Sequence, residues 1–337
     1  MLLRRFSLVL VLNLILGVVA GGSALADDDN KAKGQGYAIA SLANVAGADY
    51  SDATDVGDRG QIIGLSGPHA VMQVGGQLID FDLPPGRTAS WAFGQNDHGE
   101  IVGGTHDASG HARAASWQDG RWTELGTLTG GTISEAHAVN SRGLVVGYST
   151  ITGDHDRHAV LWDNKGKPID LGMLPGDTNS EARGINDRGE IVGESYTTEG
   201  PRHAVVWRDR VISALPALPG GGDSAAYNIN ARGQIVGFSG VHAVLWDNGG
   251  VKDLGTLPGS SASRAYGIND RGDVVGSSDV AYYPHAVVWS HGTTTDLGTL
   301  PGGTQSEARS INAHGKVAGQ SYDGTGHAWA VTWDKGR

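Results

Sequence analysis

Residues 180–220 read SEARGINDRGEIVGESYTTEGPRHAVVWRDRVISALPALPG, and variants of this stretch return along most of the chain. The shared pattern is S-x-A-x-x-(I/V)-N-x-x-G-x-(I/V)-(I/V/A)-G, followed by a variable segment and H-A-V-x-W. The first glycine of the pattern recurs at intervals of 39 to 46 residues, at Gly60, Gly99, Gly143, Gly189, Gly233, Gly272 and Gly315. A unit of this length cannot bury its own faces, so the units must stack or close on one another.

One copy of the repeat is predicted to form four short strands. Alternating residues indicate a first strand over 180–185, and the tight turn NDRG at 186–189 leads into a second strand over 190–195. After a polar loop, a third strand is expected over 203–207 and a fourth over 211–218. Four antiparallel strands in about 40–45 residues have the size of a propeller blade.

The two ends of the repeat region complement each other. The last copy stops at 333–337, after its third strand, whereas the segment 37–42 is a strand that precedes the first copy. Pairing 37–42 with 327–333 would complete the seventh blade and leave no gap in the ring. We therefore predict an all-β fold, a seven-bladed β-propeller of four-stranded antiparallel blades, the last closed by the N-terminal strand. The alternative, a linear solenoid, would need polar capping repeats, and the sequence has none.

The segment before the repeats has the features of an export signal. Arg4 and Arg5 precede an apolar run over 6–19, and Ala-Leu-Ala at 24–26 is typical of a cleavage site. We expect 1–26 to be a signal peptide, 27–36 a flexible tail, and 37–337 a single propeller domain of seven repeats of about 44 residues. The apolar run is short for a membrane span, so the protein is expected to be secreted or periplasmic, with no membrane span.

The composition limits the classes of partner. The formal net charge is −11 at pH 7, and it becomes −13 without Arg4 and Arg5. An acidic chain with no basic cluster argues against nucleic acid and anionic membranes as partners. The chain has no cysteine, so its stability must come from packing and strand pairing.

Two motifs of the repeat suggest a family. The third strand and the segment after it read HAVLW with DLGMLPG at 158–162 and 170–176, and HAVVW with DLGTLPGG at 285–289 and 296–303. The chain resembles the extracellular HAF-type repeat family over essentially its whole mature length. This resemblance implies a secreted or cell-surface repeat protein, and the family has no general activity to transfer. Copies depart from the pattern at Gly57 (Asn elsewhere), Gln73 (Trp elsewhere), and Arg113 and Trp329 (both His elsewhere).

Recurrent polar and aromatic residues have simpler interpretations than ligand binding. One repeat position holds His69, His158, His203, His242 and His285. Equivalent positions of different blades lie too far apart to share a metal ion, so we expect buried histidines bonded to neighbouring backbone. The repeat tryptophans, Trp117, Trp162, Trp207, Trp246, Trp289 and Trp333, are expected to pack between blades instead of forming a sugar-stacking belt.

Two further motifs are weak candidates for metal binding. The asparagine before each turn glycine lacks the carboxylates of a calcium loop and fits a hairpin turn. The sequence Asp154-His155-Asp156 is either a local metal candidate or a solvated loop, and we favour the loop. We predict no metal and no cofactor.

The informative variation lies in the first strand of each copy. Eight residues before the turn glycine stand Asp52, Trp91, Glu135, Glu181, Ala225, Arg264 and Glu307, and six before it stand Thr54, Phe93, His137, Arg183, Tyr227, Tyr266 and Arg309. Because first strands line the axis of a propeller, these side chains are expected to ring one mouth of the channel, together with the loops 150–157, 196–202 and 280–284. The alternative is that they fill space between blades or face water. Our candidate ligand-binding residues are Trp91, Phe93, Glu135, His137, Glu181, Arg183, Tyr227, Arg264, Tyr266, Glu307 and Arg309.

No catalytic motif is visible in the sequence. We therefore predict an exported, non-enzymatic binding or scaffold propeller that recognises a glycan, a peptide or a surface protein through the channel mouth. The alternative is an exported propeller hydrolase or lyase with an acidic or metal site in the central channel. Convergence of Asp52, Glu135, Glu181 and Glu307 with raised carboxylate pKa values would favour that alternative. A purely structural repeat protein is a third possibility, favoured if side chains fill the channel.

Overall fold

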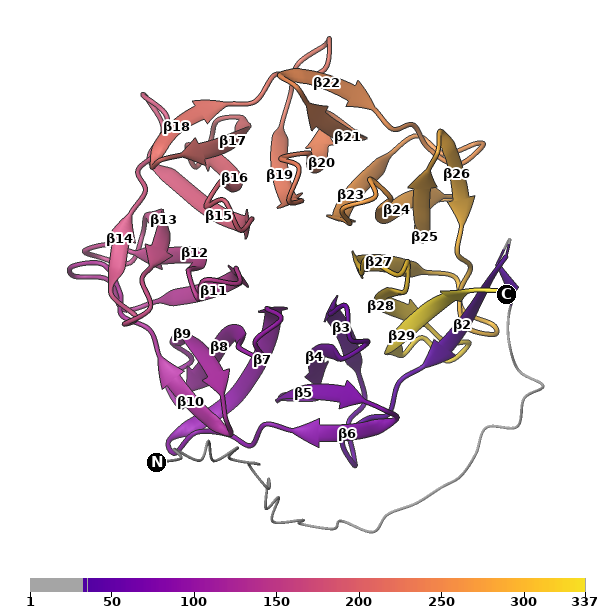
Figure 1. The fold of residues 1–337 in the computed structure, drawn as a ribbon, viewed down its shortest axis with the longest axis horizontal. Coiled ribbons are helices and arrows are strands. Elements are labelled where there is room, and N and C mark those ends of the chain that lie inside the picture. Colours follow the sequence, from indigo (N-terminus) through magenta and orange to yellow (C-terminus); the bar gives the residue numbers. More distant parts are fainter. Residues whose placement is uncertain (1–32, 35, 337) are drawn as a thin grey trace, which may run out of the picture. The chain divides into compact units, whose positions relative to one another are not determined.

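The computed structural model describes residues 33–34 and 36–336, and its strands form a ring of seven antiparallel sheets (Figure 1). Six sheets contain four strands and the sheet of the last blade contains five. The ring confirms the predicted seven-bladed β-propeller. The predicted signal peptide, 1–26, lies outside the described residues, as does most of the predicted tail, 27–36. Within the described residues, no helix is long and apolar enough to cross a membrane.

The strands take equivalent places in the seven blades (Figure 1). The innermost strands are β3 (Ser51–Val56), β7 (Arg87–Gln95), β11 (Ser134–Val139), β15 (Asn179–Ile185), β19 (Ser224–Ile229), β23 (Ser263–Ile268) and β27 (Ser306–Ile311). The second strands are β4 (Ile62–Ser66), β8 (Ile101–Asp107), β12 (Val145–Thr150), β16 (Ile191–Tyr196), β20 (Ile235–Ser239), β24 (Val274–Val280) and β28 (Val317–Tyr322).

The two outer positions complete each blade. The third strands are β5 (His69–Val74), β9 (Ala112–Gln118), β13 (Arg157–Trp162), β17 (Arg202–Arg208), β21 (His242–Asp247), β25 (Tyr283–Ser290) and β29 (Ala328–Lys335). The outermost strands are β6 (Gln77–Asp80), β10 (Arg121–Glu124), β14 (Pro168–Asp170), β18 (Val211–Ala214), β22 (Gly250–Asp253), β26 (Thr293–Asp296) and, in the last blade, β2 (Tyr37–Ser41).

The outermost strand is shorter than predicted. In the copy at residues 180–220, β18 ends at Ala214, not at 218. Leu215 donates one more backbone hydrogen bond, to Ala204, but Pro216 has no N–H to continue the ladder. The chain then leaves the blade, and the Leu218 N–H donates to the Ser239 hydroxyl of the next blade (2.9 Å).

The N-terminal strand closes the ring as predicted. Strand β2 pairs antiparallel with β29, with Ile39 opposite Trp333, and the Leu42 N–H donates to the carbonyl of Ala330. Two residues of the predicted tail, Lys33 and Gly34, form the short strand β1, which pairs with β2. The last blade is therefore built from both ends of the domain.

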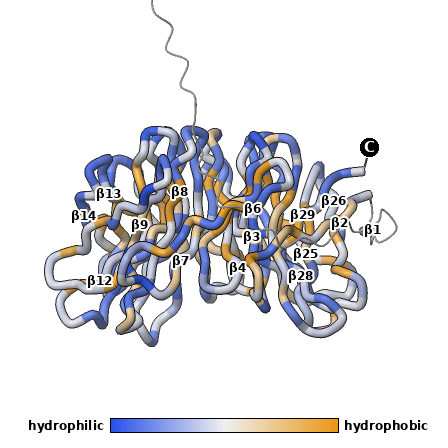
Figure 2. The backbone as a smooth tube through the Cα atoms, turned by 90° about the horizontal axis from the view of Figure 1, so that it is seen from below, coloured by the Kyte–Doolittle hydropathy of each residue, from blue (hydrophilic) through white to orange (hydrophobic). Residues whose placement is uncertain are grey.

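The hydrophobic core lies between neighbouring blades. In the second and third blades, for example, Val102 and Ala114 pack in one cluster with Val160 and Trp162. The side chains of Trp162, Trp207 and Trp333 are fully buried, which confirms that these repeat tryptophans are core residues. Figure 2 shows hydrophobic segments at mid-height of the blades, whereas the loops on both faces are largely hydrophilic.

The same serine hydrogen bond recurs between every blade and the next. The hydroxyl of the repeat serine accepts the N–H of the repeat alanine in the preceding blade, at 2.8–3.0 Å. The last of these bonds runs from Ala330 to Ser51 and crosses the closure of the ring. Because a buried N–H without a partner is costly, this bond accounts for serine at that position of all seven copies.

Candidate ligand-binding site at the channel mouth

Every innermost strand carries a β-bulge at the same position. The register of the strand pair shifts across one residue in each blade, and that residue has no partner in the neighbouring strand. The seven bulged residues are Thr54, Phe93, His137, Arg183, Tyr227, Tyr266 and Arg309. A bulge changes the direction of a side chain relative to the strand. The bulges therefore direct the variable position of the repeat toward the channel mouth.

The glycine of the second strand is required by this bulge. A Cβ atom on Gly147 would lie 1.9 Å from the carbonyl oxygen of Glu135. The equivalent glycines of the other six blades meet the equivalent carbonyl at 1.9–2.0 Å. Any larger residue would push the strands apart, which explains why this glycine recurs in every copy.

Six of the seven bulged residues line a cavity of about 620 Å³ at one mouth of the channel, whereas the Thr54 hydroxyl donates to the carbonyl of Ala92 (2.7 Å). The cavity is lined by Phe93, Glu135, His137, Tyr148, Arg157, Glu181, Arg183, Tyr196, Arg202, Tyr227, Tyr266 and Arg309. Eight of these twelve belong to the eleven residues predicted from the sequence. We call this cavity the funnel. The sequence predicts these eight residues at one mouth of the channel.

Three predicted residues lie outside the lining. Trp91 packs against His106, with ring centroids 4.5 Å apart. The guanidinium of Arg264 lies over Phe238, 4.4 Å from the ring centroid. Glu307 forms an ion pair with Arg309 (3.1 Å) and so acts on the funnel only through that residue.

Four lining residues were not among the predicted ones. Tyr148 is the cross-strand neighbour of Glu135, and Arg157, Tyr196 and Arg202 flank the hairpins between second and third strands. The last three fall inside the loops that the sequence assigned to this face, so a signal for them existed. Tyr148 directly follows the repeat glycine in the second strand. It reaches the mouth because the strand register places it opposite Glu135.

The carboxylates around the funnel are neutralised by arginines. Arg183 lies 3.3 Å from Glu181 and 2.8 Å from Glu194, and Arg202 lies 2.9 Å from Glu194. The Glu194 side chain is only 2% exposed. Burial alone would raise the pKa of Glu194, but Arg183 and Arg202 lower it below its ordinary value. Glu194 is therefore a fixed anion that positions two guanidinium groups.

The opposite wall has the same arrangement. Arg309 lies 3.1 Å from both Asp52 and Glu307. Burial raises the pKa of the Asp52 carboxyl, and Arg309 opposes this shift. Asp52 and Glu307 are therefore both paired with Arg309.

His137 is held between two glutamates. Its Nε2 lies 3.0 Å from Glu135 Oε1, while Nδ1 lies 2.9 Å from the carbonyl of Ala182 and 3.6 Å from Glu181. Burial alone would lower the pKa of His137, but the hydrogen bond to Glu135 and the charges of Glu181 and Glu135 raise it above its ordinary value. Both ring nitrogens face acceptors, so the imidazolium form is the one this environment stabilises.

Aromatic rings form part of the wall. The rings of Tyr227 and Tyr266 lie 5.5 Å apart, and Arg183 lies 5.4 Å from the ring centroid of Tyr227. Burial raises the pKa of Tyr266 to about 12, and it raises that of Tyr148 to about 12 as well. Both phenols are therefore neutral and can donate hydrogen bonds.

The repeat histidines differ from the prediction. They are only partly buried, and Nδ1 contacts an aspartate side chain of the same blade instead of backbone. The distances from the histidine Nδ1 are 3.0 Å for His69–Asp80, 2.7 Å for His158–Asp170, 2.6 Å for His242–Asp253 and 2.9 Å for His285–Asp296. Because the outermost strand of the fourth blade ends in Ala214, His203 has no such partner and lies 3.6 Å from Asp177.

Within residues 33–34 and 36–336, no group of three or more acidic or histidine side chains is arranged to hold a metal ion. In the Asp154-His155-Asp156 loop, Asp154 accepts hydrogen bonds from Thr132 and Thr150, which lower its pKa to about 2. Asp154 thus holds its loop to Thr132 and Thr150 by hydrogen bonds.

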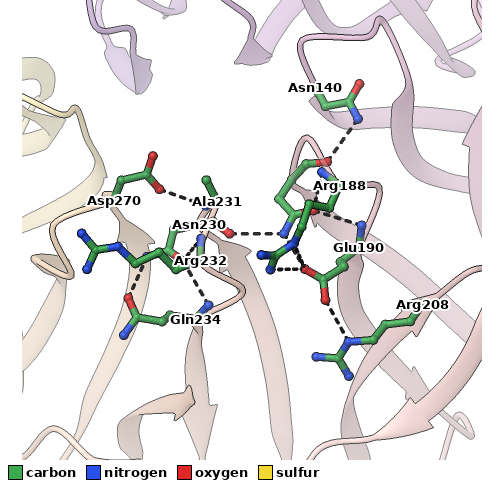
Figure 3. A network of polar contacts seen from close by, with 10 residues as sticks. Asn140, Arg188, Glu190, Arg208, Asn230, Ala231, Arg232, Gln234 and Asp270 are labelled. Atoms are coloured by element: carbon green, nitrogen blue, oxygen red, sulfur yellow. Dashed lines mark hydrogen bonds and ion pairs between the residues drawn. The ribbon is translucent and has the colours of Figure 1, made fainter. Parts of the chain in front are cut away.

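The opposite mouth of the channel is built by the hairpin turns between first and second strands. The amide of each turn asparagine donates to a carbonyl of the next blade, from Asn96 through Asn140, Asn186, Asn230 and Asn269 to Asn312. Figure 3 shows this network around Asn230, where Asp270 also accepts the Ala231 N–H (2.9 Å). The asparagines are therefore turn residues, as predicted, and they also bond the blades together.

No family model matches the sequence. No curated protein matches it in sequence either. Solved structures match it in fold. The extracellular domain of BT4673 from B. thetaiotaomicron has a TM-score of 0.58 at 8% identity, covering 88% of this chain and 39% of that one. A puromycin-hydrolyzing peptidase of Mycobacterium tuberculosis has a TM-score of 0.54 at 12% identity, covering 87% and 50%.

A third match is the β-propeller domain of the Trilobed protease from Pyrococcus furiosus. It has a TM-score of 0.54 at 10% identity, covering 85% of this chain and 94% of that one. This chain spans 39% and 50% of the length of the other two proteins. The likeness is one of fold. Identities this low carry no activity from these proteins to this chain.

Proposed function

We propose that this protein is an exported, non-enzymatic binding propeller that recognises a glycan in the funnel. The observation that carries the proposal is the set of bulges, because six of the seven bulged residues, all at a variable position of the repeat, line a single hollow. A cavity of about 620 Å³ falls in the range of small-ligand sites, about 300–1,000 Å³. A ligand of this size is a short oligosaccharide or the end of a longer chain.

The chemistry of the wall favours a neutral or weakly charged polar ligand with apolar faces. Aromatic rings such as Tyr227 and Tyr266 offer flat apolar surface, and arginines already paired with carboxylates offer fixed donors. Sugars present an apolar ring face and hydroxyls at its edge, which match both features.

A peptide fits this site less well. One common mode of peptide binding adds a strand to a regular sheet edge. Each innermost strand here is interrupted by its bulge at the mouth, so no such edge faces the funnel. We keep peptide binding as an outcome of the test.

Export and family membership are part of the same proposal. The predicted signal peptide at 1–26 supports a secreted or periplasmic location. The HAVxW and DLGTLPGG motifs support membership of the HAF-type repeat family. An extracellular location would bring the funnel into contact with glycans.

The test is calorimetric titration of the chain from residue 27 onward with cello-, chito- and galacturono-oligosaccharides, and with a random peptide pool. We expect one sugar series to bind, and Tyr227→Ala/Tyr266→Ala to weaken that binding about tenfold or more, since aromatic contacts contribute roughly 0.5–1.5 kcal/mol each. The control variant is Arg59→Ala/His314→Ala, which changes exposed turn residues of the opposite mouth. Unchanged affinity in the tyrosine variant, or binding of peptides alone, would reject the glycan site.

A further inference from the structure

The hairpin of the sixth blade, β24–β25, extends further than its neighbour. In the fifth blade the pairing ends at Ser239 opposite His242. In the sixth blade the equivalent pair, Ser278 and His285, is followed by Asp279 opposite Pro284 and by Val280 opposite Tyr283. Two extra residue pairs lengthen the hairpin by roughly 7 Å.

The tip of this hairpin has an unfavourable backbone conformation. Its two turn residues, Ala281 and Tyr282, have φ values of 48° and 76°. Turns of this kind favour Asn-Gly because the left-handed region disfavours larger side chains. A bulky residue there is an outlier, and such outliers concentrate at functional sites.

Packing does not explain the aromatic residues at the tip. The Tyr282 side chain is 100% exposed and Tyr283 is 48% exposed. Both are among the few large apolar residues on the surface, whereas Val280 beneath them packs against the core. The hairpin therefore presents two aromatic rings to the outside on a paired β-ladder.

The hairpin stands at the edge of the funnel. Hairpins between second and third strands lie on this face, since Arg157, Tyr196 and Arg202 at their bases line the cavity. In the sixth blade, Tyr266 lines the funnel, and Arg264, two residues before it, pairs with Ser277 of β24. The tip begins at Ala281, four residues after Ser277 and roughly 13 Å along the strand.

One arginine lies next to this strand with its charge unpaired. Arg264 is the cross-strand neighbour of Ser277, it is exposed, and none of the described acidic side chains forms an ion pair with it. Arg183, Arg202 and Arg309, by contrast, are all bound to carboxylates. Arg264 is thus a cation without a carboxylate partner in the described chain, and its guanidinium lies over Phe238 of the fifth blade.

We propose that Tyr282 and Tyr283 form a second subsite for the glycan, which holds a sugar unit beyond those in the funnel, with Arg264 as an additional donor that no described carboxylate occupies. This inference rests on the proposed function and specifies its substrate as an oligosaccharide, not a monosaccharide. Stacking on the tyrosine rings supplies the contact. An anionic membrane is the less suitable partner for the exposed tyrosines because the chain has a net charge of −11.

The decisive variant is Ala281→Asn/Tyr282→Gly, which keeps a two-residue turn, relieves its backbone and removes one ring. We expect its melting temperature to rise by about 2–4 °C. Its affinity for hexasaccharides of the series that binds should fall about tenfold, while its affinity for the disaccharide stays unchanged. Tyr283→Ala should have the same selective effect. Val211→Ala, at an exposed residue of the outer strand β18, is the matched control and should change neither affinity.

The outcomes separate this inference from the proposed function. If Tyr227→Ala/Tyr266→Ala abolishes binding but the turn variant keeps full hexasaccharide affinity, the hairpin subsite is wrong and the funnel stands. An equal loss for disaccharide and hexasaccharide also overturns the subsite, because the hairpin would then act on the funnel itself. Co-sedimentation of the wild type, but not of the turn variant, with phosphatidylcholine vesicles would reassign the tyrosines to a membrane. If no oligosaccharide binds at all, both proposals fail.

Discussion

The bulged residue of each blade varies, whereas the repeat glycine and serine near it are fixed by backbone contacts. In the third blade, His137 is bulged, Gly147 makes room for the carbonyl of Glu135, and Ser134 accepts the N–H of Ala114. None of these contacts involves the side chain of the bulged residue. The repeat can therefore change what it presents at the mouth without disturbing the blade.

The ring of turn asparagines is open at one residue, and closing it should stabilise the protein. Gly57 takes the place of asparagine in the first blade, so no side-chain amide reaches the carbonyl of Asn96. Gly57 does not have a positive φ, and a Cβ there would meet only the flexible end of the Gln61 side chain. We expect Gly57→Asn to raise the free energy of unfolding by about 1 kcal/mol, measured by denaturant titration.

Aspartate at the same position is the control. Gly57→Asp keeps an oxygen that can accept N–H groups of the turn, as Asn96 does from His98 and Glu100, but it cannot donate to the next blade. A smaller gain for aspartate than for asparagine would assign the difference to the inter-blade bond. Equal gains would mean that the turn alone matters.

At the scale of elements, a histidine–aspartate pair joins the third strand to the outermost strand. In the sixth blade, the hydrogen bond to Asp296 raises the pKa of His285, and burial opposes this shift only partly. Burial would raise the pKa of Asp296, but bonds from His285 and the Gly298 N–H lower it. The pair adds a side-chain contact to the backbone pairing between the third strand and the outermost strand.

These shifts predict a pH dependence of stability. Because the pKa of His285 is raised on folding, its contribution is full below the unfolded value, about 6.5, and is lost as pH rises through the folded value. Because the pKa of Asp296 is lowered, its contribution is lost only as pH falls below about 4. His285→Gln should therefore reduce the difference in melting temperature between about pH 5.5 and 8. The corresponding change in the free energy of unfolding should be less than about 1 kcal/mol. His314→Gln, in an exposed turn, should leave that difference unchanged.

The sequence predicted most elements but not their side-chain partners. Seven copies of one pattern locate the strands, and the variable position of the first strand identified Tyr227 and Tyr266 as mouth residues. Tyr148 was missed because it reaches the mouth only through its pairing with Glu135, which depends on strand register. The aspartate partners of the histidines were missed for a similar reason, since Asp170 and His158 meet only when the two strands pair.

For the whole propeller domain, stability depends on how the ring closes. Strand β2 belongs to the start of the domain but completes the blade formed by its end. Opening the ring at this point requires separating β2 from β29 as well as separating two blades. Each of the other six blades is one continuous stretch of chain. In the described domain, only the last blade combines strands from the two ends, which strand pairing holds together.

This closure can be tested by circular permutation. The Gly336 N–H donates to the carbonyl of Gly36 (2.8 Å), so a two-residue linker can join these ends as a hairpin. New ends between Gly221 and Gly222 then leave seven complete blades, with no blade shared by the two ends. We expect this permutant to keep its circular dichroism spectrum. Its free energy of unfolding should fall by at least about 2 kcal/mol, because no blade is then formed by strands from both ends of the chain.

A second permutant isolates the shared blade as the cause. It carries the same linker, but its new ends lie in the loop between β16 and β17, at 198–199, so the fourth blade is now built from both ends. Its melting temperature should lie near that of the wild type, with the first permutant below it by roughly 1.5 °C for each kcal/mol lost. Hydrogen exchange should locate the extra opening of the first permutant at the junction of the fourth and fifth blades. If both permutants melt at the same temperature, the sharing of a blade contributes nothing, and the inter-blade contacts alone hold the ring.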